Sequence, residues 1–181
     1  MGILSMLFGK HESVSIADED VDLELYAPVS GPLIPLSDVP DLVISECIVG
    51  DGVAIIPENQ EIVAPCDGII SRILSSNNAF AIRTSCGIEV YVTCGIGTRR
   101  FTGEGFSSNV KNGDRVKKGD VIISFDMNKA SSNLKSSATS LIVVRSSSDI
   151  AKVAVSSGKA IAGNTVCAKV VLNHPQDTHT A

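Results

Sequence analysis

Hydrophobic and polar residues alternate along short segments through most of the chain. In residues 88–93, IEVYVT, isoleucine and valine alternate with glutamate, tyrosine and threonine, and a Cys-Gly pair follows. Alternation of this kind predicts a β-strand that buries one face and exposes the other. We therefore expect a strand that ends near Thr93 and presents the threonine side chain on its more polar face.

The same pattern recurs along the sequence and predicts an all-β protein. Short runs rich in valine and isoleucine are separated by Gly, Pro, Asn or Asp, as in DLELYAP, GVAIIP, GIISRIL, AFAIRT, VIISFD and SLIVVRS. Closely spaced turns between such runs are typical of sandwiches and barrels. Only residues 127–137 and 147–158 have sequences compatible with short helices. We predict a single all-β domain over residues 21–172, with minor short helices.

One sequence frame occurs twice. Residues 24–34, ELYAPVSGPLI, and residues 61–71, EIVAPCDGIIS, share a glutamate, an Ala-Pro pair and a glycine at matching positions. An Ala-Pro-x-x-Gly turn between two apolar runs, used twice, predicts a duplicated hairpin element that builds a paired or closed sheet.

The two ends of the chain differ from the β domain. Residues 1–20 are predicted to be a flexible N-terminal segment, in which residues 3–8, ILSMLF, place apolar side chains on one helical stripe. The stripe is too short to form a stable helix alone in water. It either docks loosely on the domain or orders on a membrane surface or a partner. Residues 173–181 are predicted to be a disordered tail.

Composition and charge narrow the classes of function. The chain of 181 residues carries a net charge of −5 and only 4% aromatic residues, which argues against nucleic-acid binding. The five cysteines show no CxxC spacing and no signal-peptide pattern precedes them, so we expect reduced thiols and a cytoplasmic location. The only histidines are His11, His174 and His179. Because residues 21–172 contain no histidine, we expect no metal, no cofactor and a binding module rather than an enzyme.

A series of longer stretches resembles a known family. In chain order they are APVSG, DVPDLVISECIVGDGVAI, APCDGII, SNNAFAI, GIEVYVTCGIGT, GEGF, NGDRVKKGD and SFD. Together they resemble the glucose-specific IIA component of the bacterial phosphoenolpyruvate-dependent sugar phosphotransferase system. The resemblance implies an antiparallel β-sandwich of the barrel-sandwich hybrid type, and partners among phosphotransferase proteins, sugar permeases and kinases. It also implies that residues 3–8 are similar to a short amphipathic segment that contacts anionic membranes, at their inner face.

The resemblance places two substitutions at the centre of the family's chemistry. In the family, one histidine accepts a phosphoryl group from the histidine phosphocarrier protein and passes it to a permease IIB domain, and a second histidine stabilises it. The first position is Thr93 here and the second is Asn78, while the residues around both match the family. A neutral imidazole attacks phosphorus directly, whereas a threonine hydroxyl needs a base. The family's zinc-bridged contact is also excluded without the two histidines.

The resemblance also implies a docking surface, and this surface departs from the family at one edge. The corresponding apolar residues are Val43, Ile44, Ile48, Val49 and Phe80, and the acidic edge is Asp41 and Glu46. The family's acidic residue after Gly-Ile is Gly97 here, and Arg99, followed by Arg100, stands at a small apolar position. Two arginines would repel a partner that docks through a basic face. The alternative is that they are ordinary solvated charges.

Three hypotheses for the function follow. The leading hypothesis is a degenerate IIA-type protein that is not phosphorylated by the family's mechanism and acts as a protein-binding, regulatory module of carbohydrate uptake. The first alternative is a working phosphocarrier that uses Thr93 or Cys94 as an unusual acceptor, although alternation points Cys94 to the face opposite Thr93. The second alternative is a module for small anions or ligands that uses Asn78, Thr93 and Arg99. Ser76 and Asn78 could hydrogen-bond an anion or be ordinary turn residues.

Overall fold

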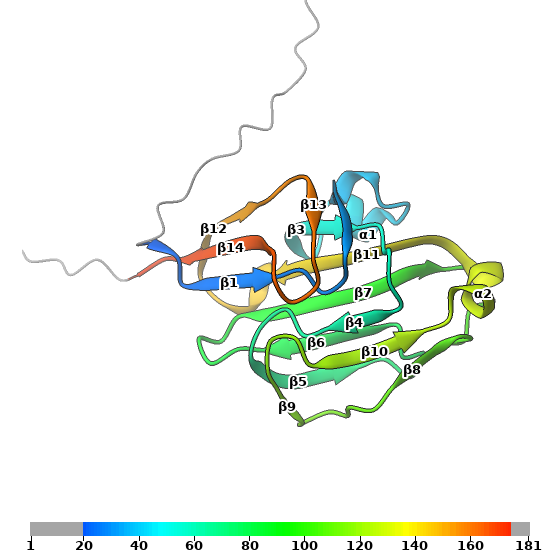
Figure 1. Ribbon diagram of the computed structural model, residues 1–181. Helices are drawn as coiled ribbons and strands as arrows, with labels where there is room; N and C mark the ends of the chain where they lie inside the picture. The colour runs from blue at the N-terminus through cyan, green and yellow to red at the C-terminus, as the bar shows by residue number, and fades with distance from the viewer. Residues whose placement is uncertain (1–19, 175–181) are drawn as a thin grey trace, which may run out of the picture.

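The computed structural model describes residues 20–174, and most of this part of the chain is antiparallel β-sheet (Figure 1). An eight-stranded sheet, called the main sheet below, forms the larger layer. Its strands in spatial order are β13 (Lys159–Ala160), β2 (Gly31–Pro35), β3 (Gly50–Ile55), β11 (Leu134–Val144), β7 (Glu89–Gly97), β6 (Ala79–Arg83), β5 (Gly68–Ile73) and β9 (Arg115–Val116).

Two smaller sheets of three strands each pack against the main sheet (Figure 1). The first contains, in order, β1 (Leu23–Tyr26), β14 (Val166–Leu172) and β12 (Ile150–Val155), and the second contains β4 (Glu61–Val63), β10 (Val121–Phe125) and β8 (Phe106–Ser108). One apolar core unites all three sheets, with Leu25 from the first, Ile123 from the second and Phe80 from the main sheet, each fully buried. The face of the main sheet that packs on this core is called the core face, and the opposite face is called the outer face.

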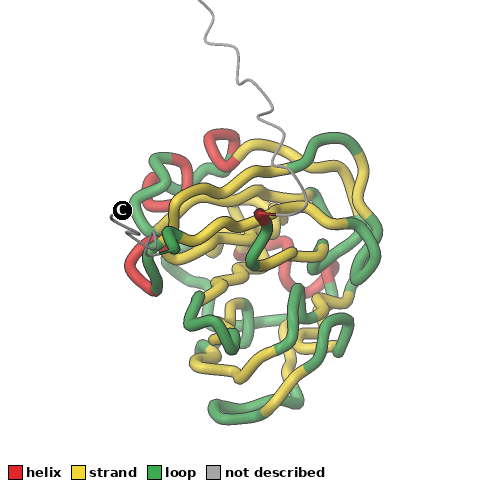
Figure 2. Tube along the Cα trace, turned by 90° about the vertical axis from the view of Figure 1, so that its left-hand side faces the viewer, coloured by secondary structure: helices red, strands yellow, loops and turns green. Residues whose placement is uncertain are grey.

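Short helices cover part of the outer face. A segment with η2 (Leu36–Asp38) and α1 (Leu42–Ser45) packs its Leu36, Val39 and Ile44 side chains into a second apolar cluster on strands of the main sheet. Helix α1 begins after Asp41, whose carboxylate accepts hydrogen bonds from two backbone N–H groups of the first turn and so caps the helix. The other helical segments are α2 (Met127–Ala130), η3 (Ser131–Asn133) and η4 (Arg145–Ser147). Figure 2 shows the helical segments, in red, as a small part of the trace.

The predicted all-β fold is confirmed, and one of the two predicted helical regions is wrong. Residues 127–137 contain α2 and η3 before β11 begins at Leu134. Residues 147–158 instead contain β12, which pairs with β14 over most of its length. Ile150 and Val153 of β12 pack against the main core, and this tertiary contact favours the strand over a local helix.

The duplicated frame is present in the structure, but it does not form hairpins. The strands on either side of each Ala-Pro-x-x-Gly turn join different partners: β1 pairs with β14 and β2 with β3, while β4 pairs with β10 and β5 with β6. The two frames instead bond to each other. Tyr26 N–H donates to Pro65 O at 2.9 Å, and Val63 N–H donates to Pro28 O at 2.8 Å. These bonds join equivalent positions reciprocally, so the frame makes two matched corners between sheets.

The predictions for the two chain ends lie largely outside the described residues. The apolar stripe of residues 3–8 and the tail beyond residue 174 both fall there. Within residues 20–174, no helix combines the length and the apolar character needed to cross a bilayer.

Candidate functional site

Thr93 lies in the middle of β7 and not at its end. The strand continues through the Cys-Gly pair to Gly97 because Gly95 adopts a φ of +71°, a conformation that glycine reaches without strain. The pairing register between β7 and β11 shifts here, and Ile96 consequently joins the cluster on the outer face although Cys94 lies in the main core. The predicted strand end near Thr93 is therefore wrong.

The Thr93 side chain lies on the outer face among small neighbours. Its pairing partners are Ala79 on β6 and Ser140 on β11, and Ser140 in turn pairs with Ala54 on β3. Thr93 is 7% exposed and Ser140 is fully buried. Neither hydroxyl has a hydrogen-bond partner among the described residues. Thr93 thus has no neighbouring base there that would activate its oxygen for attack.

Asn78 lies next to Thr93, so the fold brings together the two positions at which the resemblance places the family's histidines. Backbone and side chain both attach Asn78 to β7: Cys94 N–H donates to Asn78 O at 2.7 Å, and Asn78 Nδ2 donates to Cys94 O at 3.4 Å. Ser76 Oγ donates to Asn78 Oδ1 at 2.5 Å. These contacts hold the Asn78 amide as a structural link in the 76–78 turn. An amide group also cannot take up or release a proton for catalysis at neutral pH.

Cys94 lies on the core face, as strand alternation predicts. Its side chain is 1% exposed, and Thr139 Oγ1 donates a hydrogen bond to Cys94 Sγ at 3.7 Å. Burial raises the pKa of the Cys94 thiol to about 12. Because the thiolate is the reactive form, a buried thiol with such a pKa is inert as a nucleophile at neutral pH.

The predicted docking surface is only partly exposed. Val43 and Ile48 are 48% and 65% exposed, whereas Val49 is half-buried and Ile44 packs into the outer cluster. Phe80 was expected in this patch, and that expectation is wrong, because Phe80 is fully buried in the main core.

Two further residues belong to this surface and were missed. Leu42 is 77% exposed beside Val43, because α1 turns Ile44 inward and leaves the preceding residues in solvent. Tyr91 lies two residues before Thr93 on the same face and is half-buried. Burial raises the pKa of the Tyr91 hydroxyl, nearby Arg72 lowers it and nearby Asp41 raises it. The alternating stretch around Thr93 contains the signal for Tyr91, since residues two apart on a strand share a face.

The acidic edge has two members with different roles. Asp41 Oδ1 accepts from Val43 N–H at 2.9 Å and from Ile44 N–H at 3.2 Å, so its carboxylate is engaged in the helix cap. Glu46 is exposed at the end of α1 and is free of such a structural role among the described residues. Glu46 is therefore the acidic side chain most available to a basic partner.

Arg99 and Arg100 are exposed in the segment after β7. Within the described part of the chain, neither side chain forms an ion pair or hydrogen bond. Gly97 precedes them, and a Cβ atom there would lie 2.7 Å from the Phe101 ring. The Phe101 side chain therefore occupies the space that an acidic residue at position 97 would need.

The described histidine flanks a different sheet from the one that contains Thr93. His174, the one histidine among the described residues, follows β14 and contacts Asp22 through Nε2 at 3.0 Å to Oδ1, and both residues flank a sheet that does not contain Thr93. Residues 20–174 also contain no group of three or more His, Cys, Asp or Glu side chains that could hold a metal ion.

The geometry defines a class: an antiparallel β-sandwich with an apolar and acidic surface beside two central polar residues, Asn78 and Thr93. Residues 23–150 match the family model for the phosphoenolpyruvate-dependent sugar phosphotransferase system, EIIA 1. The chain is 42% identical over 166 residues to the PTS system glucose-specific EIIA component of Haemophilus influenzae, covering 92% of this chain and 96% of the relative. The chain belongs to this EIIA family.

Two further comparisons agree with this assignment. The PTS system glucose-specific EIICBA component of Staphylococcus saprophyticus is 38% identical over 132 residues, which cover 73% of this chain and 20% of that protein. The solved structure of glucose permease IIA from Mycoplasma capricolum superposes with a TM-score of 0.73 at 28% identity, covering 81% of this chain and 94% of that chain. The antiparallel β-sandwich implied by the sequence is thereby confirmed.

Proposed function

We propose that this protein is an EIIA-type binding module that does not carry a phosphoryl group by the histidine mechanism. The observation that carries the proposal is the state of Thr93, which occupies the position of the family's acceptor histidine. Its hydroxyl is buried and has no hydrogen-bond partner or base among the described residues. The second position, Asn78, holds an amide that already bonds to Ser76 and to the backbone of β7.

Chemical arguments support the loss of transfer. A threonine hydroxyl attacks phosphorus only after a base removes its proton, and the resulting phosphate ester is a poor donor for the next transfer. Cys94 offers no substitute acceptor, because it lies on the core face with a pKa raised to about 12 by burial. The alternative of a phosphocarrier with an unusual acceptor therefore lacks an activated nucleophile at either residue.

The exposed apolar surface supports a role in protein binding. Leu42, Val43 and Ile48 project into solvent from one short segment, with Glu46 beside them. Large exposed apolar side chains next to polar ones are typical of protein-interaction sites. The partners that fit are proteins of the phosphotransferase system and sugar permeases or kinases. The EIICBA relative, in which the matched region is part of a longer chain, supports a permease partner.

Phosphorylation with purified components tests the proposal. The protein is incubated with phosphoenolpyruvate, enzyme I and the histidine phosphocarrier protein, with the Haemophilus influenzae relative as the positive control. We expect label on the relative and none on this chain. Stoichiometric label on the wild-type chain would contradict the proposal, and its loss in Thr93→Ala or Cys94→Ser would then identify the acceptor.

A second experiment tests binding separately from transfer. A single-site variant, Leu42→Asp, is compared with Ile161→Asp, which changes another exposed apolar residue, 58% exposed and distant in sequence. We expect Leu42→Asp to reduce the affinity for a IIB domain or permease in a calorimetric titration, and Ile161→Asp to leave it unchanged. Equal affinities of both variants for the partner would show that the surface around Leu42 does not bind it. Calorimetric titration of phosphate into the wild type and into Thr93→Val tests the remaining alternative of a small-anion module at Asn78 and Thr93, and equal heats in the two proteins would reject it.

A further inference from the structure

A cavity of about 740 Å³ lies at the end of β6 that is remote from Asn78. It is formed by β5, β6 and β9 of the main sheet and by the turns beside these strands. The residues that line it are Asp67, Gly68, Ile69, Ser71, Arg83, Thr84, Ser85, Arg115, Val116, Lys117 and Asp120. Its volume is in the range of pockets that hold small-molecule ligands, roughly 300–1,000 Å³.

The strand register places two arginines in one row of this cavity. Ile69 on β5 pairs with Arg83 on β6 and with Arg115 on β9, so the two arginines flank Ile69 across the sheet. Ile69 is 39% exposed and supplies an apolar surface between them. Lys117 follows two residues after Arg115 and adds a third cationic side chain to the lining.

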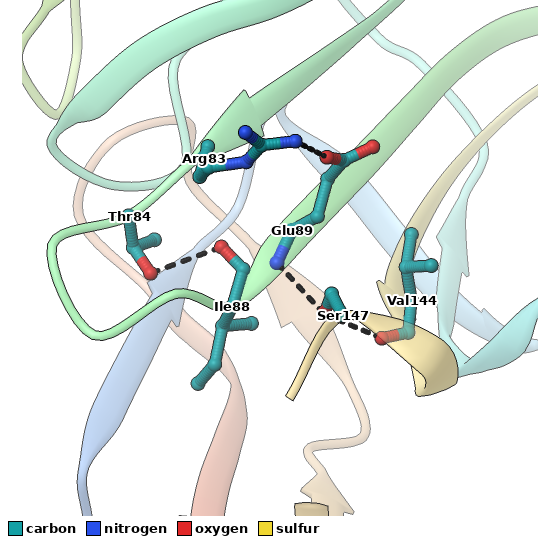
Figure 3. Close-up of polar contacts among 6 residues, drawn as sticks. All are labelled: Arg83, Thr84, Ile88, Glu89, Val144 and Ser147. Carbon is teal, nitrogen blue, oxygen red and sulfur yellow. Dashed lines mark hydrogen bonds and ion pairs between the residues drawn. The ribbon is translucent and has the colours of Figure 1, made fainter. Parts of the chain in front are cut away.

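Two of the three cations have no internal counter-ion. Arg83 is paired, because its Nη2 lies 3.1 Å from Glu89 Oε2 at the start of β7 (Figure 3). Arg115 and Lys117 form no ion pair with any described residue. They are therefore available to an anion in the cavity.

The two carboxylates in the lining are already engaged by backbone groups. Asp67 Oδ1 accepts from Lys118 N–H at 2.7 Å, and Asp120 Oδ2 accepts from Lys117 N–H at 2.8 Å. These bonds fix the turns, and both carboxylates keep their negative charge. With three cations and two carboxylates, the lining carries a formal charge of +1 in a chain whose net charge is −5.

A buried hydroxyl in the lining also lacks a partner. Ser71 Oγ is buried and forms no hydrogen bond among the described residues. Thr84 Oγ1, in contrast, donates to Ile88 O at 3.0 Å (Figure 3). Because buried polar groups in native proteins are almost always hydrogen-bonded, the unpaired hydroxyl of a residue that lines a cationic cavity is consistent with a hydrogen-bond acceptor on a ligand there.

We propose that this cavity binds a small phosphate monoester. Guanidinium groups form paired hydrogen bonds to phosphate oxygens, and Arg115 and Lys117 would both contact the charged head group. Ser71 would donate to a phosphate oxygen, and Ile69 would contact the apolar part of the molecule. The site goes beyond the proposed function, because it shares no residue with the surface around Thr93.

An NMR titration of the full chain tests this assignment. Backbone amide shifts are followed while inorganic phosphate, glycerol 3-phosphate or citrate is added, at constant ionic strength. The variant Arg115→Gln/Lys117→Gln removes the two unpaired cations. The matched control Arg72→Gln/Lys111→Gln removes the same charge from exposed residues outside the lining. A third variant, Ser71→Ala, removes the unpaired hydroxyl.

The proposal predicts saturable shifts at Ser71, Ser85 and Arg115 with glycerol 3-phosphate. The double cavity variant should weaken this affinity at least about tenfold, while the matched control keeps it. Ser71→Ala should weaken binding without lowering the melting temperature of the free protein, because its hydroxyl has no internal bond to lose. Absence of saturable shifts with every probe, equal weakening in the matched control, or tighter binding of citrate than of the phosphates would each overturn the assignment.

Discussion

Neighbouring hydroxyl groups on the two faces of the main sheet have different surroundings. Thr93 and Cys94 are consecutive on β7, and Thr139 and Ser140 are consecutive and opposite to them on β11. On the core face, Thr139 donates to the Cys94 thiol. On the outer face, Thr93 and Ser140 oppose each other, and neither hydroxyl has a partner within residues 20–174.

The difference separates a structural position from a functional one. The core-face pair is satisfied internally, as expected where only packing is required. By the resemblance to the family, the outer-face pair includes the position of the acceptor histidine. Thr93 lies there without a hydrogen-bond partner among the described residues, and exposed apolar residues lie on the same side of the main sheet. We interpret this combination, as in the proposed function, as a binding surface that does not carry a phosphoryl group.

The largest predicted effect concerns Phe80 on the core face. Phe80→Ala should lower the free energy of unfolding by about 3–5 kcal/mol, because it removes a fully buried aromatic side chain and leaves a cavity. Val43→Ala, at the exposed docking surface, should change it by less than about 0.5 kcal/mol. Urea unfolding of both variants measures these values. If Phe80→Ala lowered the free energy of unfolding only slightly, Phe80 would not be a core residue, and the sequence-based prediction that it belongs to the docking surface would stand.

Three buried thiols in the main core predict a loss of stability at alkaline pH. Burial raises the pKa of Cys66, Cys94 and Cys167 from 9.0 to about 12. The unfolded chain therefore releases these protons first, so the contribution is fully present below pH 9 and is lost as pH rises toward 12. The slope is about 1.4 kcal/mol per pH unit for each thiol.

Urea unfolding on either side of pH 9 checks this prediction. Cys94→Ala should reduce the thiol contribution to the slope by about one third while leaving its direction unchanged. A slope that is identical in the wild type and in Cys94→Ala would show that this thiol does not stay protonated in the folded state.

A smaller effect is expected at the edge of the outer face. Arg99→Gln/Arg100→Gln should increase affinity for the basic docking face of the histidine phosphocarrier protein by about tenfold at low salt, with a smaller gain at high salt. Lys111→Gln/Lys118→Gln removes equal charge from exposed residues elsewhere and serves as the control. Isothermal titration at two salt concentrations measures both. The same gain in both variants would assign the effect to net charge instead of to this edge.

The smallest effects compare the outer-face pair, Thr93 and Ser140, with the core-face pair, Cys94 and Thr139. Thr93→Val should leave the free energy of unfolding unchanged or raise it by up to about 1 kcal/mol, because the hydroxyl it removes is buried without a partner. Thr139→Val should lower it by about 0.5–1.5 kcal/mol, because it breaks the bond to Cys94. Thermal and urea unfolding compare the two. A larger loss for Thr93→Val would reveal a hydrogen bond at Thr93.

Local pattern was sufficient for some of these features. Alternation in residues 88–93 predicts a strand with Cys94 and Thr93 on opposite faces, and both hold in the structure. The end of that strand could not be predicted, because a Cys-Gly pair is typical of a turn and only the positive φ of Gly95 lets pairing with β11 continue. The corners made by the duplicated frame were also inaccessible, since their partners lie far apart in sequence.

Residues whose exposure depends on tertiary packing were the least predictable. Phe80 belongs to AFAIR, a run whose first four residues are all buried, so the run shows no alternation that would reveal which face it takes. Leu42 is exposed because a single-turn helix directs Ile44 inward, a contact that the local sequence does not specify. The row of Arg83, Ile69 and Arg115 depends on pairing between three strands. These features required the complete fold.

The mass of the intact wild-type chain after incubation with phosphoenolpyruvate, enzyme I and the histidine phosphocarrier protein tests the central claim most directly. The Haemophilus influenzae relative, treated in parallel, establishes that the donors are active. The account predicts that the relative gains the mass of one phosphoryl group while this chain keeps its original mass. A gain of one phosphoryl group on this chain would contradict the account.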